Sequence, residues 1–291
     1  MKESSTETLG TFIGSIENHR KREKGVLVYS VYSRRSCGLS VGINLFPDKK
    51  QCSFDCPYCE VFPFSNNSGF YADFMEDDLR AAIAFALKKN IPVRDICFSG
   101  NGEPTLSPDF PEALEKAGRV RTELVPDAQL VLITNGSFLL EEKLFSLLAR
   151  AAISLDLNIW LKLDAGTNFW YKKMNRSVLP FEKIIEKIKE FTAAAPVTIQ
   201  TMICAVDGEG PPKEEAEAWE KLLLEMVSAG NAKGNSGIRK VQIYGKARPA
   251  PEDPKASALP VNCLEERAAS LRAALASAFA AQNIPPVEVY P

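Results

Sequence analysis

Short apolar runs alternate with longer amphipathic stretches along most of the chain. The apolar runs predict strands at 26–31, 39–45, 95–99, 130–134, 159–163, 197–203 and 241–244, with a short strand at 287–290. Apolar positions repeating every three or four residues predict helices at 73–89, 110–123, 141–151, 180–193, 213–229 and 262–282, after a polar N-terminal helix at 7–24. This alternation indicates an α/β fold with a parallel sheet. Six strand–helix units, counted from residue 39, fit a partial (βα)6 parallel barrel.

Composition supports a globular protein. The chain has 291 residues, of which 45% are hydrophobic and 25% charged, so it can bury a sizeable core. No apolar run approaches the roughly 18 residues of a membrane span, and we expect no membrane partner and a cytoplasmic location. The net charge of −2 gives no general attraction to nucleic acid. A basic stretch at 19–24 could contact RNA or an acidic partner, or form a solvated helix face.

Three cysteines carry the most specific chemistry. Cys52, Cys56 and Cys59 have the spacing C-x3-C-x2-C. Thiolates so close in sequence can bind three irons of an iron–sulfur cube and leave the fourth iron open for another ligand. A structural zinc site needs a fourth ligand, but the only histidine is His19. A ferredoxin needs a fourth cysteine nearby, and the next one is Cys97. An odd, sparse set of seven cysteines also disfavours a disulfide framework.

Further stretches join the cysteine motif in a resemblance to the radical S-adenosylmethionine (SAM) superfamily. They are 33–35 with 39–45, 98–106, 133–137, 162–165 and 248–249, so that the likeness spans roughly residues 33–249. It is closest to the branch that contains the wyosine-base-forming tRNA enzymes and uncharacterised relatives. The resemblance implies a radical SAM core domain at 33–291, with its C-terminal helix and short terminal strand, after an N-terminal extension at 1–32.

The same resemblance implies the cofactors and the reaction. The cofactors would be a [4Fe–4S] cluster on Cys52, Cys56 and Cys59, and SAM on the open iron. Reductive cleavage of SAM would give a 5′-deoxyadenosyl radical that abstracts hydrogen from a substrate. An external one-electron donor, such as flavodoxin or ferredoxin, would supply the electron.

A second motif follows the predicted strand at 95–99. In Gly100-Asn101-Gly102-Glu103, Asn101 stands where the superfamily usually has glycine. We expect these four residues to bind SAM, since glycine allows backbone to approach a ligand closely and Glu103 can accept a charge-assisted hydrogen bond. The alternative is a tight turn that ends the strand.

Other candidate cofactor-binding residues also lie near predicted strand ends, which converge on one face of a parallel sheet. Tyr58 resembles an aromatic residue near the adenine, or else caps the core. Asn135 and Asp164 could bind the ribose or the methionine carboxylate, or cap a helix. Arg176 could pair with the SAM carboxylate or a substrate anion, or be an ordinary surface arginine.

Four polar residues on the predicted strands have open roles. Lys162 shares a strand face with Asp164, so it could bind substrate, form a Schiff base or pair with that carboxylate. Cys204 is either a core residue or a thiol facing the substrate. Gln200 and Gln242 line the cavity or satisfy the core.

The substrate stays open. Wyosine-forming relatives carry a second cluster on upstream cysteines, where this chain has only Cys37, so the sequence does not predict their activity. A tRNA-modifying role, a protein-activating role and a non-enzymatic iron–sulfur or zinc protein remain alternatives.

Overall fold

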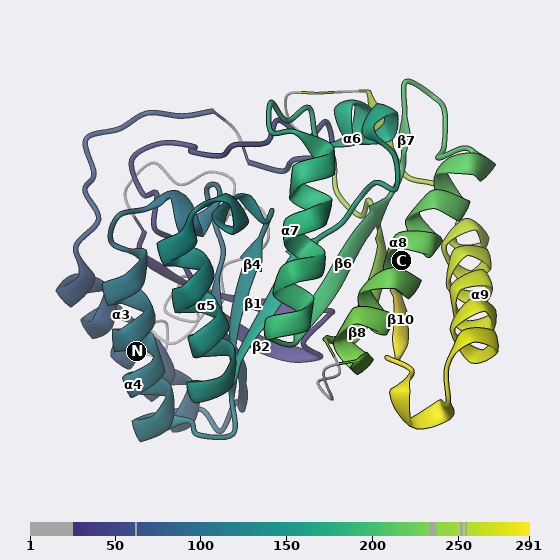
Figure 1. Ribbon diagram of the computed structural model, residues 1–291. Helices are drawn as coiled ribbons and strands as arrows, with labels where there is room; N and C mark the ends of the chain where they lie inside the picture. The colour runs from purple at the N-terminus through teal and green to yellow at the C-terminus, as the bar shows by residue number, and fades with distance from the viewer. Residues whose placement is uncertain (1–25, 62, 233–236, 251–252, 254) are drawn as a thin grey trace. The chain divides into compact units, whose positions relative to one another are not determined.

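A computed structural model describes residues 26–61, 63–232, 237–250, 253 and 255–291 (Figure 1). The predicted helix at 7–24, His19 and the basic stretch lie outside the described residues. The chain divides into two compact units. The first unit is Met1–Cys52, Val61–Ile133 and Leu155–Leu157, and the second unit is Ser53–Glu60, Thr134–Ser154 and Asn158–Pro291.

The first unit is built on four neighbouring strands. β1 (Val28–Ser33) pairs antiparallel with β2 (Gly38–Ile43), and β3 (Val93–Phe98) and β4 (Gln129–Thr134) continue in parallel. Helices α3 (Ala72–Lys88) and α4 (Phe110–Leu124) pack against one another (Figure 1). A short 3₁₀ helix, η1 (Pro104–Leu106), precedes α4. All six residues of β2 are buried, as expected for an apolar run within a parallel sheet.

The second unit repeats the strand–helix alternation. Its parallel strands are β5 (Leu157–Lys162), β6 (Val197–Ile203), β8 (Ile238–Gly245) and β10 (Val287–Tyr290), side by side in that order. Strands β7 (Ala205–Val206) and β9 (Ala256–Ser257) form a separate antiparallel pair. The helical segments are η2 (Ser137–Leu140), α5 (Glu142–Ser154), α6 (Asn168–Met174), α7 (Phe181–Ala194), α8 (Lys213–Ala232), α9 (Val261–Ala278) and η3 (Ala281–Asn283).

Every strand and long helix predicted within the described residues is present, with ends shifted by a few residues. The helix predicted at 262–282 ends earlier, at Ala278, and the chain then turns towards Pro285 and Pro286, which cannot continue a helix. The short elements were missed, among them α6 and the strands β7 and β9. Helix α6 has seven residues, too few for a periodic pattern, and strands β7 and β9 have only two residues each.

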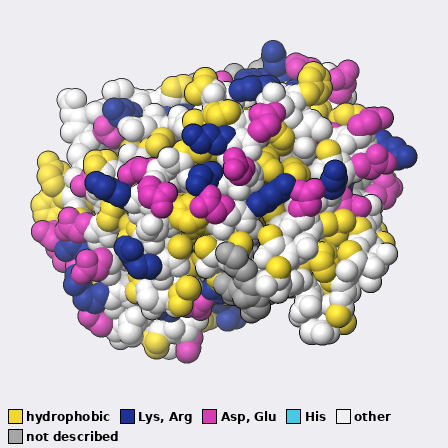
Figure 2. Space-filling view, viewed as in Figure 1, with side chains coloured by type: hydrophobic (Ala, Val, Ile, Leu, Met, Phe, Trp, Pro, Cys, Tyr) yellow, Lys and Arg dark blue, Asp and Glu magenta, His cyan; other side chains and the backbone are white. Residues whose placement is uncertain are grey.

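The predicted boundary between an extension at 1–32 and a core at 33–291 stays a prediction. Strand β1 (Val28–Ser33) crosses that boundary. Within the described part of the chain, no helix is long and apolar enough to cross a membrane. On the face drawn in Figure 2, basic and acidic side chains are interspersed, in keeping with the net charge of −2.

Candidate functional site

The chain just before Cys52 is held by backbone pairing within the first unit. Gln51 forms a parallel bridge with Gly102. The Gln51 amide donates to the Asn101 carbonyl over 3.1 Å, and the Glu103 amide donates to the Gln51 carbonyl over 2.8 Å. Gly102 has φ 155°, and a Cβ built there would lie 1.8 Å from the Gln51 carbonyl oxygen. Glycine is therefore required at position 102, because the backbone of Gln51 approaches it closely.

The other residues of the glycine motif bind neighbouring protein groups. The Asn101 amide donates to Asn44 Oδ1 over 3.1 Å, and Asn101 Nδ2 donates to the Phe46 carbonyl over 3.1 Å. Glu103 is 2% exposed and accepts from the amide and hydroxyl of Thr105, 3.2 and 2.7 Å away. These contacts form the tight turn that was the alternative interpretation. SAM binding by residues 100–103 stays a prediction.

The chain after Cys52 belongs to the second unit and packs on α6. The Cys59 amide donates to the Cys56 carbonyl over 2.9 Å, so these two cysteines flank one turn. The Asp55 amide donates to the Asn175 carbonyl over 3.0 Å, and the Phe54 ring meets Tyr171 edge-on. Cys56 and Cys59 are half-buried and Cys52 is exposed, so none of the three is an ordinary core thiol.

Asp164 is the centre of the polar network beneath this turn. Its side chain has no exposed surface, and Oδ1 accepts from the Met202 amide and the Lys162 ammonium, each 2.8 Å away. Oδ2 accepts from the Tyr58 hydroxyl and from Asn175 Nδ2, which is 2.9 Å away. Each carboxylate oxygen therefore has two protein donors. That arrangement suits a residue that positions the loop better than one that binds ribose.

Lys162 is a buried cation. Its ammonium pairs with Asp164, donates to the Tyr244 hydroxyl, and lies 5.1 and 4.4 Å from the ring centroids of Tyr58 and Tyr244. Burial alone would lower the pKa of Lys162, but the Asp164 charge and the bonds to Asp164 and Tyr244 outweigh it and raise this pKa. The predicted ion pair is confirmed. Since an ammonium is not a nucleophile, this geometry does not favour a Schiff base.

Tyr58 acts here as a hydrogen-bond donor. Burial, and then the negative charge of Asp164, raise the pKa of Tyr58 well above its usual value. The phenol therefore stays protonated at neutral pH and can donate a hydrogen bond to the Asp164 carboxylate. Contact between Tyr58 and adenine stays a prediction.

Asn135 and Arg176 both lie next to the cysteine loop within the second unit. Asn135 Nδ2 donates to Ser53 Oγ over 3.0 Å, and Asn135 Oδ1 accepts from the Ser137 amide over 2.9 Å. The N-cap of the following helix η2 is Gly136, without a side-chain cap bond, so Asn135 does not have the predicted capping position. Asn135 instead closes the turn before η2 and bonds to the residue that follows Cys52. Arg176, with φ 46°, pairs with Asp253. Its binding of a SAM or substrate carboxylate stays a prediction.

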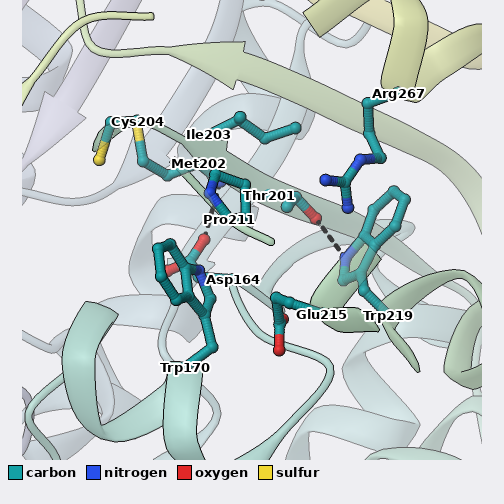
Figure 3. A pocket seen from close by; sticks show the side chains of 10 residues that line it. All are labelled: Asp164, Trp170, Thr201, Met202, Ile203, Cys204, Pro211, Glu215, Trp219 and Arg267. Carbon is teal, nitrogen blue, oxygen red and sulfur yellow. Dashed lines mark hydrogen bonds between the residues drawn. The ribbon is translucent and has the colours of Figure 1, made fainter. Parts of the chain in front are cut away.

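The remaining strand residues serve the core of the second unit. Gln200 Nε2 donates to Gln242 Oε1 over 2.7 Å, so the two buried amides partner each other. Cys204 is 1% exposed, and burial raises its thiol pKa to about 12. A small cavity of about 10 Å³ lies beside Cys204 and Asp164, and Figure 3 shows its lining. That volume is enough for about one water molecule, not for a substrate.

The three cysteines fit a cluster in the chemistry of their donors. Thiolates are the ligands of protein iron–sulfur clusters, and each thiolate of a [4Fe–4S] cube binds its own iron. Across the described ranges, no group of three or more His, Cys, Asp or Glu side chains is arranged to hold a single metal ion. Asn175 Nδ2 lies 3.6 Å from the Cys56 sulfur, and an N–H donor of this kind stabilises a thiolate.

Comparison with models of protein families identifies the family of this chain. The model of the Radical SAM superfamily matches residues 49–219, which include the cysteine loop, residues 100–103 and Asp164. The chain therefore belongs to the radical SAM superfamily. It is an enzyme, and its cofactors are those of the family, a [4Fe–4S] cluster and SAM. The predicted superfamily, enzyme class and cofactors are confirmed.

The chain is also similar to parts of two curated proteins. The chain is 26% identical to a UPF0026 protein of Helicobacter pylori over 57% of its own length and 54% of the relative's. It is 29% identical to the GTPase Obg of Brachyspira hyodysenteriae over 55% of its length, but only 22% of that protein. The chain thus spans about a fifth to a half of these curated relatives. Its 291 residues contain no G-x-x-x-x-G-K-[ST] phosphate-binding loop.

A solved structure confirms the fold class. The crystal structure of a radical SAM methyltransferase from Sphaerobacter thermophilus matches 90% of this chain and 68% of its own, with a TM-score of 0.60 and 17% identity. At this identity the likeness concerns the fold alone. The chain has the partial-barrel α/β fold of radical SAM enzymes, as predicted.

Sequence reasoning missed two residues of the network below the cysteine turn, Asn175 and Tyr244. Asn175 follows a helix too short to be predicted, and Tyr244 has the ordinary character of a strand aromatic. Only their positions in the folded second unit bring them to Asp164 and Lys162.

Proposed function

We propose that the chain binds one [4Fe–4S] cluster through Cys52, Cys56 and Cys59 and cleaves SAM reductively. With SAM on its open iron, the cluster would supply the electron that yields a 5′-deoxyadenosyl radical, and this radical would abstract hydrogen from an unidentified substrate. The main support is the C-x3-C-x2-C loop inside a family match that covers residues 49–219.

The residues around the loop have two proposed roles. Gly100, Asn101, Gly102 and Glu103 would form the segment that approaches SAM, with Glu103 already capping the next turn. Tyr58, Asn135, Asp164 and Arg176 remain the proposed cofactor-binding set. Three of them contact the loop itself, which supports action through it: Asn135 bonds to Ser53, Asp164 accepts from Tyr58, and Arg176 lies 3.9 Å from the Asp55 carboxylate.

The reaction needs a reductant and a substrate. We propose an external one-electron donor of the flavodoxin or ferredoxin kind and a cytoplasmic setting, where thiols stay reduced for cluster assembly. The net charge of −2 does not indicate nucleic acid, but a tRNA substrate and a protein substrate both remain compatible with the site. RNA that copurifies at low salt and dissociates as salt rises would favour the tRNA role.

Anaerobic reconstitution tests the proposal. The Cys52→Ala/Cys56→Ala/Cys59→Ala variant should lose the brown colour of the cluster and form no 5′-deoxyadenosine from SAM in the presence of a reductant. Cys263→Ala is a matched control, because Cys263 is half-buried like Cys56 and Cys59 but lies outside the motif. Formation of 5′-deoxyadenosine by the triple variant would contradict the assignment. Zinc without sulfide, unaffected by SAM, would instead indicate a metal-binding module.

A further inference from the structure

We propose that Asn175 donates an N–H···S hydrogen bond to the Cys56 thiolate and thereby raises the reduction potential of the cluster. This inference rests on the proposed function, because it needs Cys56 to bind iron. The role would be that of a positioning and tuning residue, which touches a cluster ligand and not the substrate.

The backbone of Asn175 fixes it next to Cys56. Asn175 is 2% exposed and directly follows helix α6 as its C-cap, where its amide donates to the Tyr171 carbonyl over 2.8 Å. Its own carbonyl accepts from the Asp55 amide over 3.0 Å. Asp55 directly precedes Cys56, so the main chain of Asn175 places its side chain beside this cysteine.

The carboxylate of Asp164 decides which way the Asn175 amide points. Asp164 pairs with Lys162 and can only accept hydrogen bonds, so the Asn175 atom 2.9 Å from Asp164 Oδ2 must be the NH₂ nitrogen. That nitrogen carries two hydrogens, and Asp164 takes one. Its distance to the Cys56 sulfur is 3.6 Å, which the large radius of sulfur makes a hydrogen-bonding contact.

One competing acceptor lies near the second hydrogen. The Tyr58 hydroxyl oxygen is 3.5 Å from Asn175 Nδ2, beyond the usual range for N–H···O bonds. The Tyr58 hydroxyl itself donates a hydrogen bond to Asp164. The thiolate of a cluster carries negative charge and the phenol does not. A charged acceptor forms the stronger bond, so the second N–H is directed to Cys56.

The expected effect follows from charge. Reduction adds one electron to the cluster, and part of that charge resides on its thiolates. An N–H donor stabilises the reduced form more than the oxidised form, and hydrogen bonds to sulfur are among the factors that set cluster potentials. Asp164 and Lys162 hold the donor in place before reduction, so little reorganisation is needed.

A redox titration followed by electron paramagnetic resonance tests the proposal on the reconstituted full chain. In Asn175→Leu, which keeps the number and branching of the side-chain heavy atoms but has no N–H, reduction should become at least tenfold less favourable, a shift of about 59 mV to lower potential for one electron. The exchangeable-deuteron coupling assigned to this N–H should disappear from the spectrum of the reduced cluster. Asn158→Leu is the matched control, a buried amide of the same unit bonded to Thr198, and it should keep the wild-type potential.

A second variant guards against a folding defect. Asn175→Asp/Asp164→Asn exchanges the amide and the carboxylate while keeping their volume and total charge, and it should also lower the potential. An unchanged midpoint potential in either variant at full iron loading would overturn the inference. So would loss of the cluster from both variants, because it would make Asn175 an assembly residue. If the wild-type chain assembles no cluster, the proposed function itself fails, and that result is separate from these outcomes.

Discussion

The two units of this chain hold their parts of the cysteine loop in different ways. In the first unit, Gln51 is paired with Gly102 through main-chain hydrogen bonds, and this close approach requires a residue without a Cβ at position 102. In the second unit, the turn at Cys56 rests on Asn175 and, below it, on a buried network around Asp164.

This difference shows where the loop is sensitive to chemistry. A backbone bridge depends on shape, so most side chains near it can change without breaking it. A buried network of charges depends on every partner, because an ion left without its counterion in a low-dielectric interior is costly. Substitutions should therefore separate the two anchors by both the size and the kind of their effects.

The largest effect is expected for Asp164→Asn. This change leaves the Lys162 ammonium buried without a counterion and should lower the free energy of unfolding by about 3–5 kcal/mol, measured by urea denaturation. The double variant Lys162→Met/Asp164→Asn should be more stable than Asp164→Asn, because it removes the stranded charge. Wild-type stability in Asp164→Asn would show that the network does not anchor the second unit.

A somewhat smaller loss is expected for Gly102→Ala in the first unit. The new Cβ would clash with the Gln51 carbonyl at a backbone angle that disfavours L residues, at a cost of about 3 kcal/mol. Gly118→Ala is the matched control. Gly118 lies within α4, where an added Cβ meets side-chain atoms at 3.5 Å or more, so alanine should leave stability unchanged or raise it. Equal stability of Gly102→Ala and Gly118→Ala would show that the bridge between Gln51 and Gly102 does not require glycine at position 102.

The smallest effects come from a pair of tyrosines, one in each unit. Tyr58 donates to the charged Asp164, whereas the Tyr29 hydroxyl bonds to the neutral Ser99 hydroxyl over 2.6 Å. Tyr58→Phe should cost about 2 kcal/mol and Tyr29→Phe about 1 kcal/mol, because bonds to charged groups contribute more. The two losses are compared in the same denaturation experiment. The reverse order would contradict the idea that charge distinguishes the second anchor.

Much of this fold could be predicted because it depends on the pattern of apolar and polar residues that are neighbours in the sequence. The apolar run at 197–203 became β6 with the same bounds, and the periodic pattern at 110–123 became α4 with one residue added. The pair Lys162 and Asp164 followed from strand alternation alone. Helix α6 escaped prediction because seven residues contain too few turns to show a period.

The sequence by itself determined the α/β class, the order of the elements and the cysteine spacing that defines the superfamily. These depend on neighbours along the chain, where the periodicity of apolar side chains and the reach of three thiolates are visible. Only the tertiary structure decided that Gly102 makes room for Gln51 and that Asn175 stands between Asp164 and Cys56. Such contacts join residues 11 to 119 positions apart, and their hydrogen bonds do not appear in the local hydrophobic pattern.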